Sequence, residues 1–296
     1  MTQPLVSVLL PVHNGGHALL LAVWSILGQS LRDWELLVLD DASTDAALAP
    51  LGRIADERVR IVRDPVRRGL AGRLNQGIEL ARGKYFARMD HDDVAFPERL
   101  QRQAGFLESH GEVDLLGTRA LGFSAEGKAL GLLPFQQNHE SICRRPWLGF
   151  CLPHPTWMGR ADWFRRHRYR MPEPKRAEDQ DLLLRTYATS RFACLPDVLL
   201  GYRISAAGLG KLLTARMSVG RAQLRAHFRS GRPGLAFLGA GVSLAKAGVD
   251  TALAVMGRTL RTARGLERPV EPAVLAKWQQ LWREAAEWAA AMGKAS

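Results

Sequence analysis

Short apolar runs, each ended by polar residues, divide the first hundred residues into segments. Residues 6–12 and 34–39 are continuous apolar runs without alternation, and this pattern is typical of strands that are buried on both faces. Residues 58–63 and 84–89 predict a third and a fourth strand. The pattern therefore predicts that the chain opens with buried strands of one sheet.

Segments with helical spacing separate these runs. Residues 17–29 place Leu20, Val23, Trp24 and Leu27 on one helical face, and residues 70–81 predict a second helix. Strands that alternate with helices predict βαβ units and an α/β fold with a mainly parallel sheet flanked by helices. Ligands bind such sheets beyond the carboxyl ends of the strands.

The pattern is less regular after residue 100. Helices are expected at 98–110 and 176–188 and strands at 113–123 and 198–203, followed by mostly helical sequence from about 211. We therefore place a domain boundary between an α/β domain, 1–207, and a helical C-terminal region, 208–296.

The charge supports this division. The 296-residue chain has a net charge of +12, and residues 201–296 alone hold 15 basic and 5 acidic residues. This basic extension suits either an anionic partner or a solvated arginine-rich tail. The three cysteines lack zinc-site spacing and favour a reducing, cytoplasmic compartment. The first residues do not have the pattern of a signal peptide, so we expect no secretion.

Carboxylates follow two of the predicted strands. Asp40 and Asp41 end one, and Asp90, Asp92 and Asp93 follow another. Carboxylate oxygens at one sheet edge suit Mg²⁺ or Mn²⁺ shared with substrate phosphates, although aspartates also cap helices. A third acidic group, residues 178–181, opens a predicted helix, where acidic residues also favour the helix dipole.

Several enzyme classes lack their signatures in this chain. There is no P-loop, no glycine-rich dinucleotide fingerprint after the first strand, and no nucleophile elbow. These absences argue against P-loop enzymes, dinucleotide-dependent dehydrogenases and serine hydrolases of the elbow type.

Five segments, in order, resemble the family 2 glycosyltransferases of the GT-A fold. They are VSVLLPVHN, SILGQSLRDWELLVLDDASTD, GLAGRLNQGIELARGKYFARMDHDDVAFPERL, HPTWM at 154–158, and Glu178-Asp179 before a leucine-rich stretch. The resemblance covers roughly residues 5–205. It implies a Rossmann-like sheet that binds a nucleotide-diphosphate sugar, for which a UDP-sugar is favoured.

The resemblance also implies residue roles. Pro11, His13 and Asp41 would line the nucleotide base pocket, and Asn14 belongs to the same nucleotide-binding loop.

The D-x-D motif and the general base follow in the same way. Asp90 and Asp92 would form the D-x-D, with Asp92 as the direct ligand of Mn²⁺ or Mg²⁺. Asp179 would be the general base, with Glu178 as its alternative. The family inverts the anomeric configuration, and the absent Q-x-x-R-W signature favours non-processive transfer.

Other side chains stay open between two interpretations. His154 either binds substrate or is structural, and Arg67-Arg68 either approaches the diphosphate or forms a solvated turn. Trp147, Trp157 and Trp163 either stack on acceptor sugars or pack in the core.

The resemblance implies a glycan or lipid-linked acceptor in envelope polysaccharide or glycolipid assembly, and no nucleic acid partner. Two rival functions remain. One is a sugar-nucleotide pyrophosphorylase. The other is a non-enzymatic protein that binds an anionic polymer through the basic tail.

The C-terminal helices have two interpretations of their own. Residues 211–264 combine apolar faces with an arginine stripe at Arg221, Arg225 and Arg229, which suits an interfacial helix at the inner face of the membrane. A packed or homodimer-forming helix is the alternative. A true membrane span is disfavoured because it would bury Lys246 and Asp250.

Overall fold

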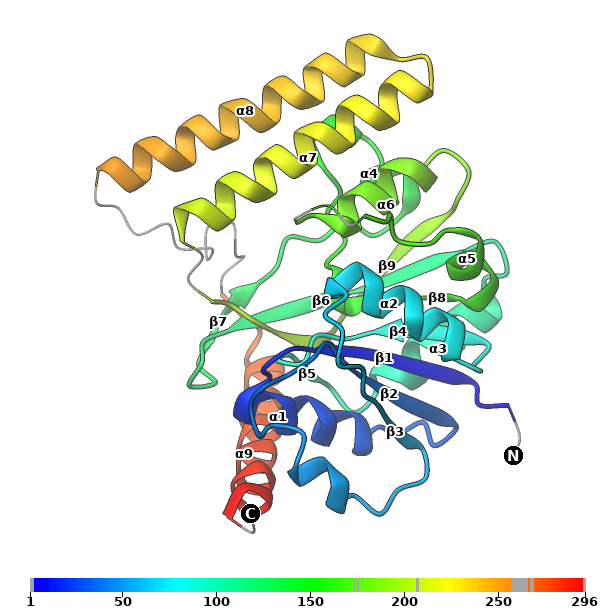
Figure 1. The fold of residues 1–296 in the computed structure, drawn as a ribbon, viewed down its shortest axis with the longest axis vertical. Coiled ribbons are helices and arrows are strands. Elements are labelled where there is room, and N and C mark those ends of the chain that lie inside the picture. The colour runs from blue at the N-terminus through cyan, green and yellow to red at the C-terminus, as the bar shows by residue number, and fades with distance from the viewer. Residues whose placement is uncertain are drawn as a thin grey trace.

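The computed structural model describes residues 3–172, 174, 176–205, 208–256, 266 and 269–294. One curled sheet lies between two layers of helices, and a pair of long helices projects beyond it (Figure 1). The strands are β1 (Val6–Val12), β2 (Trp34–Asp40), β3 (Val59–Val62), β4 (Tyr85–Arg88), β5 (Val94–Ala95), β6 (Leu115–Phe123), β7 (Ala129–Leu132), β8 (Met158–Arg160) and β9 (Phe192–Arg203).

The helices alternate with these strands in the first half and dominate the C-terminal part. They are α1 (Gly16–Leu27), α2 (Gly69–Leu80), α3 (Arg99–Ser109), α4 (His139–Ile142), α5 (Ala161–Arg166), α6 (Glu178–Thr186), α7 (Leu209–Arg229), α8 (Pro233–Val255) and α9 (Pro272–Lys294). Three short 3₁₀ turns are η1 (Pro50–Arg53), η2 (Pro146–Leu148) and η3 (His154–Thr156).

The sheet has a parallel half and a mixed half. The described strands run in the order β3-β2-β1-β4-β8-β6-β9-β5, with β7 paired to β6. Strands β1 to β4 pair in parallel, as the alternating pattern predicted. Strand β8 then pairs antiparallel with both β4 and β6, while β6 and β9 are parallel to each other.

The apolar strands fill a core on each face of the sheet. In β1, Val8 and Leu10 pack into one core, whereas Leu9 between them packs into the other. This is the two-residue period of a strand that is covered on both sides. Helices α1, α3 and α9 supply the first core, and α2, α5 and α6 supply the second. Each fully buried Val or Leu contributes about 1.5–3 kcal/mol.

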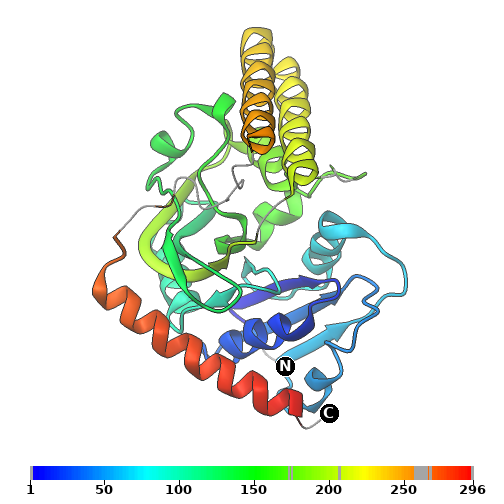
Figure 2. The ribbon, with the colours of Figure 1, turned by 90° about the vertical axis from the view of Figure 1, so that its left-hand side faces the viewer.

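The C-terminal helices occupy two separate places. Helices α7 and α8 form an antiparallel hairpin at one end of the molecule, whereas α9 runs along the opposite side, against α1 (Figure 2). Trp278 of α9 is fully buried beside Phe96 and Phe123 and donates a hydrogen bond to the carbonyl oxygen of Gly127. Helix α9 is therefore part of the core beneath the sheet. Residues 257–264 of the predicted membrane-contact segment lie outside the described residues.

Candidate active site

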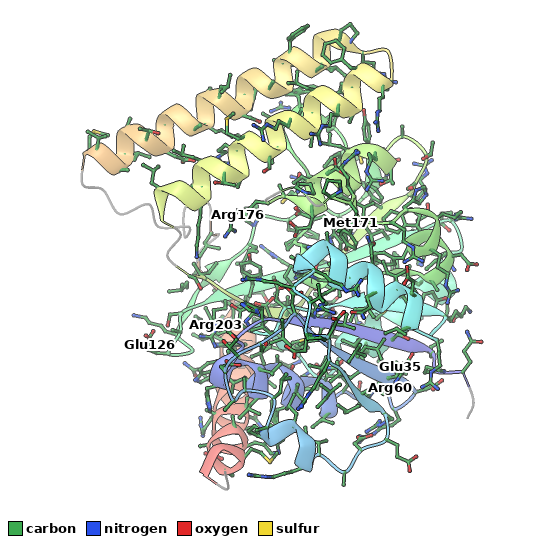
Figure 3. The ribbon with its side chains drawn as sticks, viewed as in Figure 1. Glu35, Arg60, Glu126, Met171, Arg176 and Arg203 are labelled. Atoms are coloured by element: carbon green, nitrogen blue, oxygen red, sulfur yellow. The ribbon has the colours of Figure 1, made fainter. Side chains whose placement is uncertain are left out.

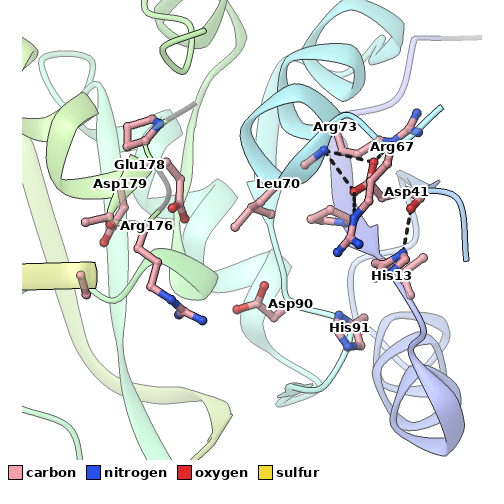
Figure 4. Close-up of a pocket in the computed structure, with 16 residues that line it drawn as sticks. His13, Asp41, Arg67, Leu70, Arg73, Asp90, His91, Arg176, Glu178 and Asp179 are labelled. Atoms are coloured by element: carbon pink, nitrogen blue, oxygen red, sulfur yellow. Dashed lines mark hydrogen bonds and ion pairs between the residues drawn. The ribbon is translucent and has the colours of Figure 1, made fainter. Parts of the chain in front are cut away.

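The loops that follow β1, β2 and β4 meet at one sheet edge and form one wall of a cleft of about 750 Å³ (Figure 4). His13, Asp41 and Arg67 lie on this wall, and Glu178 and Asp179 lie on the opposite wall. Pro11 and Asp90 also line the cleft. The structure thus brings together Pro11, His13, Asp41, Asp90 and Asp179 of the predicted site residues.

The loop after β1 is fixed by the loop after β2. His13 Nδ1 is hydrogen-bonded to the carbonyl oxygen of Asp41 at 2.8 Å. Asn14, at φ 53°, accepts a 2.8 Å hydrogen bond from the backbone N–H of Thr44 through its side-chain oxygen. Asn14 is not among the residues that line this cleft. It holds the shape of the nucleotide-binding loop that the sequence predicted, and His13 faces the cleft.

The carboxylate of Asp41 is held by the start of α2. It accepts hydrogen bonds from the backbone N–H groups of Arg68, at 2.7 Å, and Gly69, at 3.1 Å. The buried guanidinium of Arg73 also donates to it at 2.9 Å. These donors fix the position of the carboxylate at the cleft wall.

The neighbouring Asp40 serves the turn that follows β2. Its carboxylate accepts a hydrogen bond from the backbone N–H of Ser43 at 3.0 Å, and its side chain is buried. The capping interpretation therefore describes Asp40.

Three aspartates follow β4 and differ in their surroundings. Asp90 lines the cleft and pairs with Arg88 at 2.6 Å. Asp92 is half-buried, lines none of the described pockets, and forms no ion pair with a described residue. Asp93 is buried and accepts a hydrogen bond from the backbone N–H of Arg203 through one carboxylate oxygen, while its other oxygen has no partner.

The electrostatics of this cluster fit a divalent cation. Burial and the nearby Asp90 raise the pKa of Asp92, and burial and both neighbours raise the pKa of Asp93 further. A cation would relieve this repulsion, and carboxylate oxygens are ligands that Mg²⁺ and Mn²⁺ prefer. The described residues contain no cluster of three metal-binding side chains. The donor set therefore fits a metal that takes its remaining ligands from phosphate and water.

The opposite wall begins at the first turn of α6. Ala177, at φ 63°, precedes the helix and turns Glu178 and Asp179 into the cleft. Burial and the adjacent Glu178 carboxylate raise the pKa of Asp179. Burial also acts to raise the pKa of Glu178, but the hydrogen bond and charge of His154 outweigh it and lower that pKa. The two carboxylates of the pair therefore have opposite pKa shifts.

A second cleft, of about 570 Å³, opens on the other side of these carboxylates. Leu133, Phe150 and Leu152 give it an apolar wall. The residues that line both clefts are Leu70, Asp90, Arg176, Glu178 and Asp179. The two clefts therefore meet where Asp90 and Asp179 face each other.

His154 lies in the wall of the second cleft and is almost fully buried. One ring nitrogen contacts the Tyr169 hydroxyl at 2.7 Å and the other lies 3.4 Å from the Glu178 carboxylate. Because both nitrogens are engaged, His154 positions Glu178.

Position bears on the other open interpretations. Trp147 is half-buried and lines neither cleft. Trp157 and Trp163 are buried in the core and line neither cleft. Arg68 pairs with Asp64 at 2.7 Å and is half-exposed, whereas Arg67 lines the first cleft, 3.8 Å from Asp41.

Two site residues had no role in the sequence analysis. Arg73 is a fully buried arginine inside α2, and its only signal was a charge among small and apolar helix residues. Arg176 is exposed, lines both clefts and has no signal beyond its position just before Glu178.

Known proteins share this sequence and fold. Residues 7–168, more than half of the chain, match the model of glycosyl transferase family 2. The putative glycosyltransferase EpsE of Bacillus subtilis is 36% identical over 190 residues, which cover 62% of this chain and 67% of EpsE.

Two solved structures share the fold at low identity. Staphylococcus aureus TarS 1–349 in complex with UDP-GlcNAc has a TM-score of 0.61 at 18% identity, covering 96% of this chain and 81% of that one. The mannosyltransferase PcManGT of Pyrobaculum calidifontis, in complex with GDP-Man and Mn²⁺, has a TM-score of 0.60 at 18% identity, covering 99% and 87%. Together with the family match, these likenesses show that the chain belongs to glycosyl transferase family 2 and is a glycosyltransferase with the GT-A fold.

Proposed function

We propose that this glycosyltransferase moves one sugar per encounter from a nucleotide-diphosphate sugar to an acceptor hydroxyl, with inversion at the anomeric carbon. The observation that carries the proposal is the meeting of two clefts at Asp90 and Asp179. A donor in one cleft and an acceptor in the other would place their reacting atoms between these carboxylates.

The donor belongs in the first cleft. Its base would lie against Pro11, His13 and Asp41, which line one wall. A UDP-sugar is favoured because a fixed carboxylate such as Asp41 can accept the imide N–H of uracil. TarS was solved with UDP-GlcNAc and PcManGT with GDP-Man and Mn²⁺, so both kinds of donor occur on this fold.

The diphosphate would lie nearer the middle of the cleft, between Arg67 and Arg176. Asp92, with Asp90 beside it, would hold Mn²⁺ or Mg²⁺. When bound, such a metal stabilises the charge that develops on the departing diphosphate.

Asp179 would act as the general base. Its carboxylate takes the proton of the acceptor hydroxyl as that oxygen bonds to the anomeric carbon, and the bond from that carbon to the phosphate oxygen breaks. The raised pKa of Asp179 suits this role because a more basic carboxylate takes a proton more readily. His154, which also contacts the Tyr169 hydroxyl, pairs with Glu178, whereas Asp179 forms no ion pair with a described residue and accepts a 3.3 Å hydrogen bond from the side-chain amide of Gln180.

The acceptor would enter the second cleft, whose apolar wall suits a glycan or lipid-linked acceptor more than a highly charged one. We place the enzyme in the cytoplasm and, peripherally, at the inner face of the membrane, in envelope polysaccharide or glycolipid assembly. Three free cysteines and an exposed apolar helix support this location.

Substitution of the base tests the proposal. Asp179→Asn should retain nucleoside diphosphate binding and reduce kcat by about 10²- to 10⁴-fold, because the amide cannot take the proton. Turnover is measured as nucleoside diphosphate release from a panel of sugar nucleotides, with product configuration read by NMR. Asp197→Asn, at a carboxylate outside both clefts, is the matched control. Wild-type kcat in Asp179→Asn would remove Asp179 from the mechanism.

A further inference from the structure

The outer face of α8 is apolar along its whole length. Phe237, Leu244 and Val255 expose 66%, 60% and 82% of their surface. Leu238, Val249 and Met256 are also exposed. Only 17% of the most apolar stretch of this helix is buried. Soluble proteins seldom expose so large an apolar surface unless something covers it.

The charged residues of α8 point the other way. Lys246 donates a hydrogen bond from Nζ to the carbonyl oxygen of Leu148 at 3.0 Å. Asp250 pairs with Arg216 of α7 at 3.0 Å. These are the only charged residues of α8, and both are turned towards the protein. A surface helix in water has the opposite arrangement, with charges outward and apolar residues inward.

The other helix of the hairpin, α7, has a row of exposed arginines. Arg221, Arg225 and Arg229 of α7 recur every fourth residue, are exposed, and have no partner among the described residues. Phe228 lies on the exposed side of α7 and packs its ring against Phe237 at 5.4 Å between centroids. The exposed sides of the two helices therefore meet at this aromatic pair, near the turn of the hairpin.

We propose that the α7–α8 hairpin docks on an anionic lipid bilayer, with the outer face of α8 among the acyl chains and the arginine row of α7 on lipid phosphates. The charge complementarity of this row, on a chain with a net charge of +12, selects an anionic surface. The inference rests on the peripheral-membrane part of the proposed function and is independent of the sugar-transfer chemistry.

The hairpin geometry favours lying on the bilayer over crossing it. By length and composition α8 could cross a membrane, and it is the single described helix that meets this test. However, α7 packs against α8 along the hairpin (Figures 1 and 2). A spanning α8 would carry the arginine row into the hydrocarbon, which is unfavourable. A second copy on the same face would oppose two arginine rows of like charge.

This docking gives the cleft an orientation. Ala215 of α7 lines the donor-side cleft, so the hairpin forms part of its rim. An acceptor carried on a lipid would then approach from the hairpin side, toward the point where the two clefts meet.

Vesicle flotation of the full chain tests the proposal. Wild-type protein should float with vesicles of phosphatidylcholine mixed with anionic phosphatidylglycerol, and more weakly with phosphatidylcholine alone. The double variant Leu244→Asn, Val249→Asn should lose binding by about tenfold or more, because two apolar side chains no longer enter the bilayer. The triple variant Arg221→Gln, Arg225→Gln, Arg229→Gln should lose the preference for anionic vesicles.

The matched control removes the same charge elsewhere. Arg32→Gln, Arg166→Gln, Arg283→Gln changes three exposed arginines away from the hairpin and should keep both binding and lipid preference. Calorimetric binding of UDP and GDP to each variant reports on folding and on the donor site separately. Loss of nucleotide binding with intact flotation would count against the transferase proposal alone.

Three results would overturn the docking proposal. The first is wild-type protein that ignores anionic vesicles, and the second is unchanged flotation of the Leu244→Asn, Val249→Asn variant. The third is a dimer in analytical ultracentrifugation that this variant dissociates while no form of the protein binds vesicles. That result would assign the face to a second copy.

Discussion

Glu178 and Asp179 are adjacent carboxylates with opposite pKa shifts. Burial and the charge of Glu178 raise the pKa of Asp179, whereas the contact with His154 lowers that of Glu178. A base works only when it is deprotonated, so the rate of transfer should rise with pH through the raised pKa of Asp179. Environment thus separates the roles of two neighbouring acids.

The opposite pKa shifts of Glu178 and Asp179 predict that the pH dependence of kcat changes in the Glu178→Gln variant. Glu178→Gln removes the neighbouring negative charge, so the pKa of Asp179 should fall and the acidic limb of the kcat profile should move to lower pH. The measurement is kcat against pH for wild type and variant. Asp197→Asn is again the control and should leave the limb in place. A limb that stays fixed in Glu178→Gln, or moves to higher pH, would contradict the assignment of Asp179.

Arg73 and Arg68 both pair with Asp64, and we expect the buried Arg73 to contribute more to stability than the partly exposed Arg68. Its guanidinium is fully buried and contacts Asp41 at 2.9 Å and Asp64 at 3.1 Å. Arg73→Gln should lower the free energy of unfolding by about 3–5 kcal/mol, because it leaves the buried Asp41 carboxylate short of a cation. Urea unfolding measures this difference.

Arg68 is the control for that experiment. It also pairs with Asp64, at 2.7 Å, but half of its side chain is exposed. Arg68→Gln should therefore have a much smaller effect. Equal losses in the two variants would show that burial of Arg73 does not determine its contribution.

At the residue scale, the sequence indicated the cleft-lining carboxylates Asp41, Asp90 and Asp179 and left Arg67 as an alternative, but it did not indicate Arg73 or Arg176. Asp41, Asp90 and Asp179 lie at strand or helix ends, and these ends can be recognised from the pattern of apolar positions in the sequence. Arg73 lies inside a helix and Arg176 in a loop. Neither residue belongs to a sequence motif or a periodic pattern that would indicate its role. Their roles come from contacts between segments that are far apart in the chain.

At the element scale, the buried parallel strands were the most predictable. The expected strand at 6–12 and helix at 70–81 correspond to β1 and α2 within one residue. The antiparallel strands β5, β7 and β8 were not resolved from the sequence, because two to four residues are too few to show a period. An ion-pair network near the β3 edge of the sheet also carried no sequence signal. Glu35 of β2 pairs there with Arg60 of β3, both labelled in Figure 3, and with Arg82.

Helix α9 carries a prediction of its own. Trp278 is fully buried between Phe96, Phe123 and Trp282, so Trp278→Ala should lower the free energy of unfolding by about 3–5 kcal/mol. Thermal unfolding measures the effect. Phe237→Ala, at an exposed aromatic, is the control and should change stability by less than about 0.5 kcal/mol.

A small effect of Trp278→Ala would mean that α9 is dispensable to the sheet. The α/β unit 1–207 would then be stable without α9, as the proposed domain boundary at residue 207 implies. A large effect would mean that the α/β unit needs a helix from beyond the boundary, and the 208–296 region would divide into a hairpin and a core helix.

At the scale of the whole molecule, the parts of the site come from both halves of the fold. The parallel half supplies Asp41 and Asp90, and the mixed half supplies Asp179 through α6. The hairpin reaches the rim of the same cleft through Ala215. Within the described residues, α7 is thus the part of the C-terminal third that reaches this cleft.

Metal-dependent donor binding is the central claim of this account, and calorimetric titration tests it most directly. Full-length protein would be titrated with UDP, GDP, TDP and CDP, with and without Mn²⁺, and Asp92→Asn would be titrated in parallel. We predict that one nucleotide, with UDP favoured, binds tightly with Mn²⁺, binds weakly without it, and loses the benefit of Mn²⁺ in Asp92→Asn. Folded protein that binds none of the four nucleotides, or binds equally well without metal, would contradict the account.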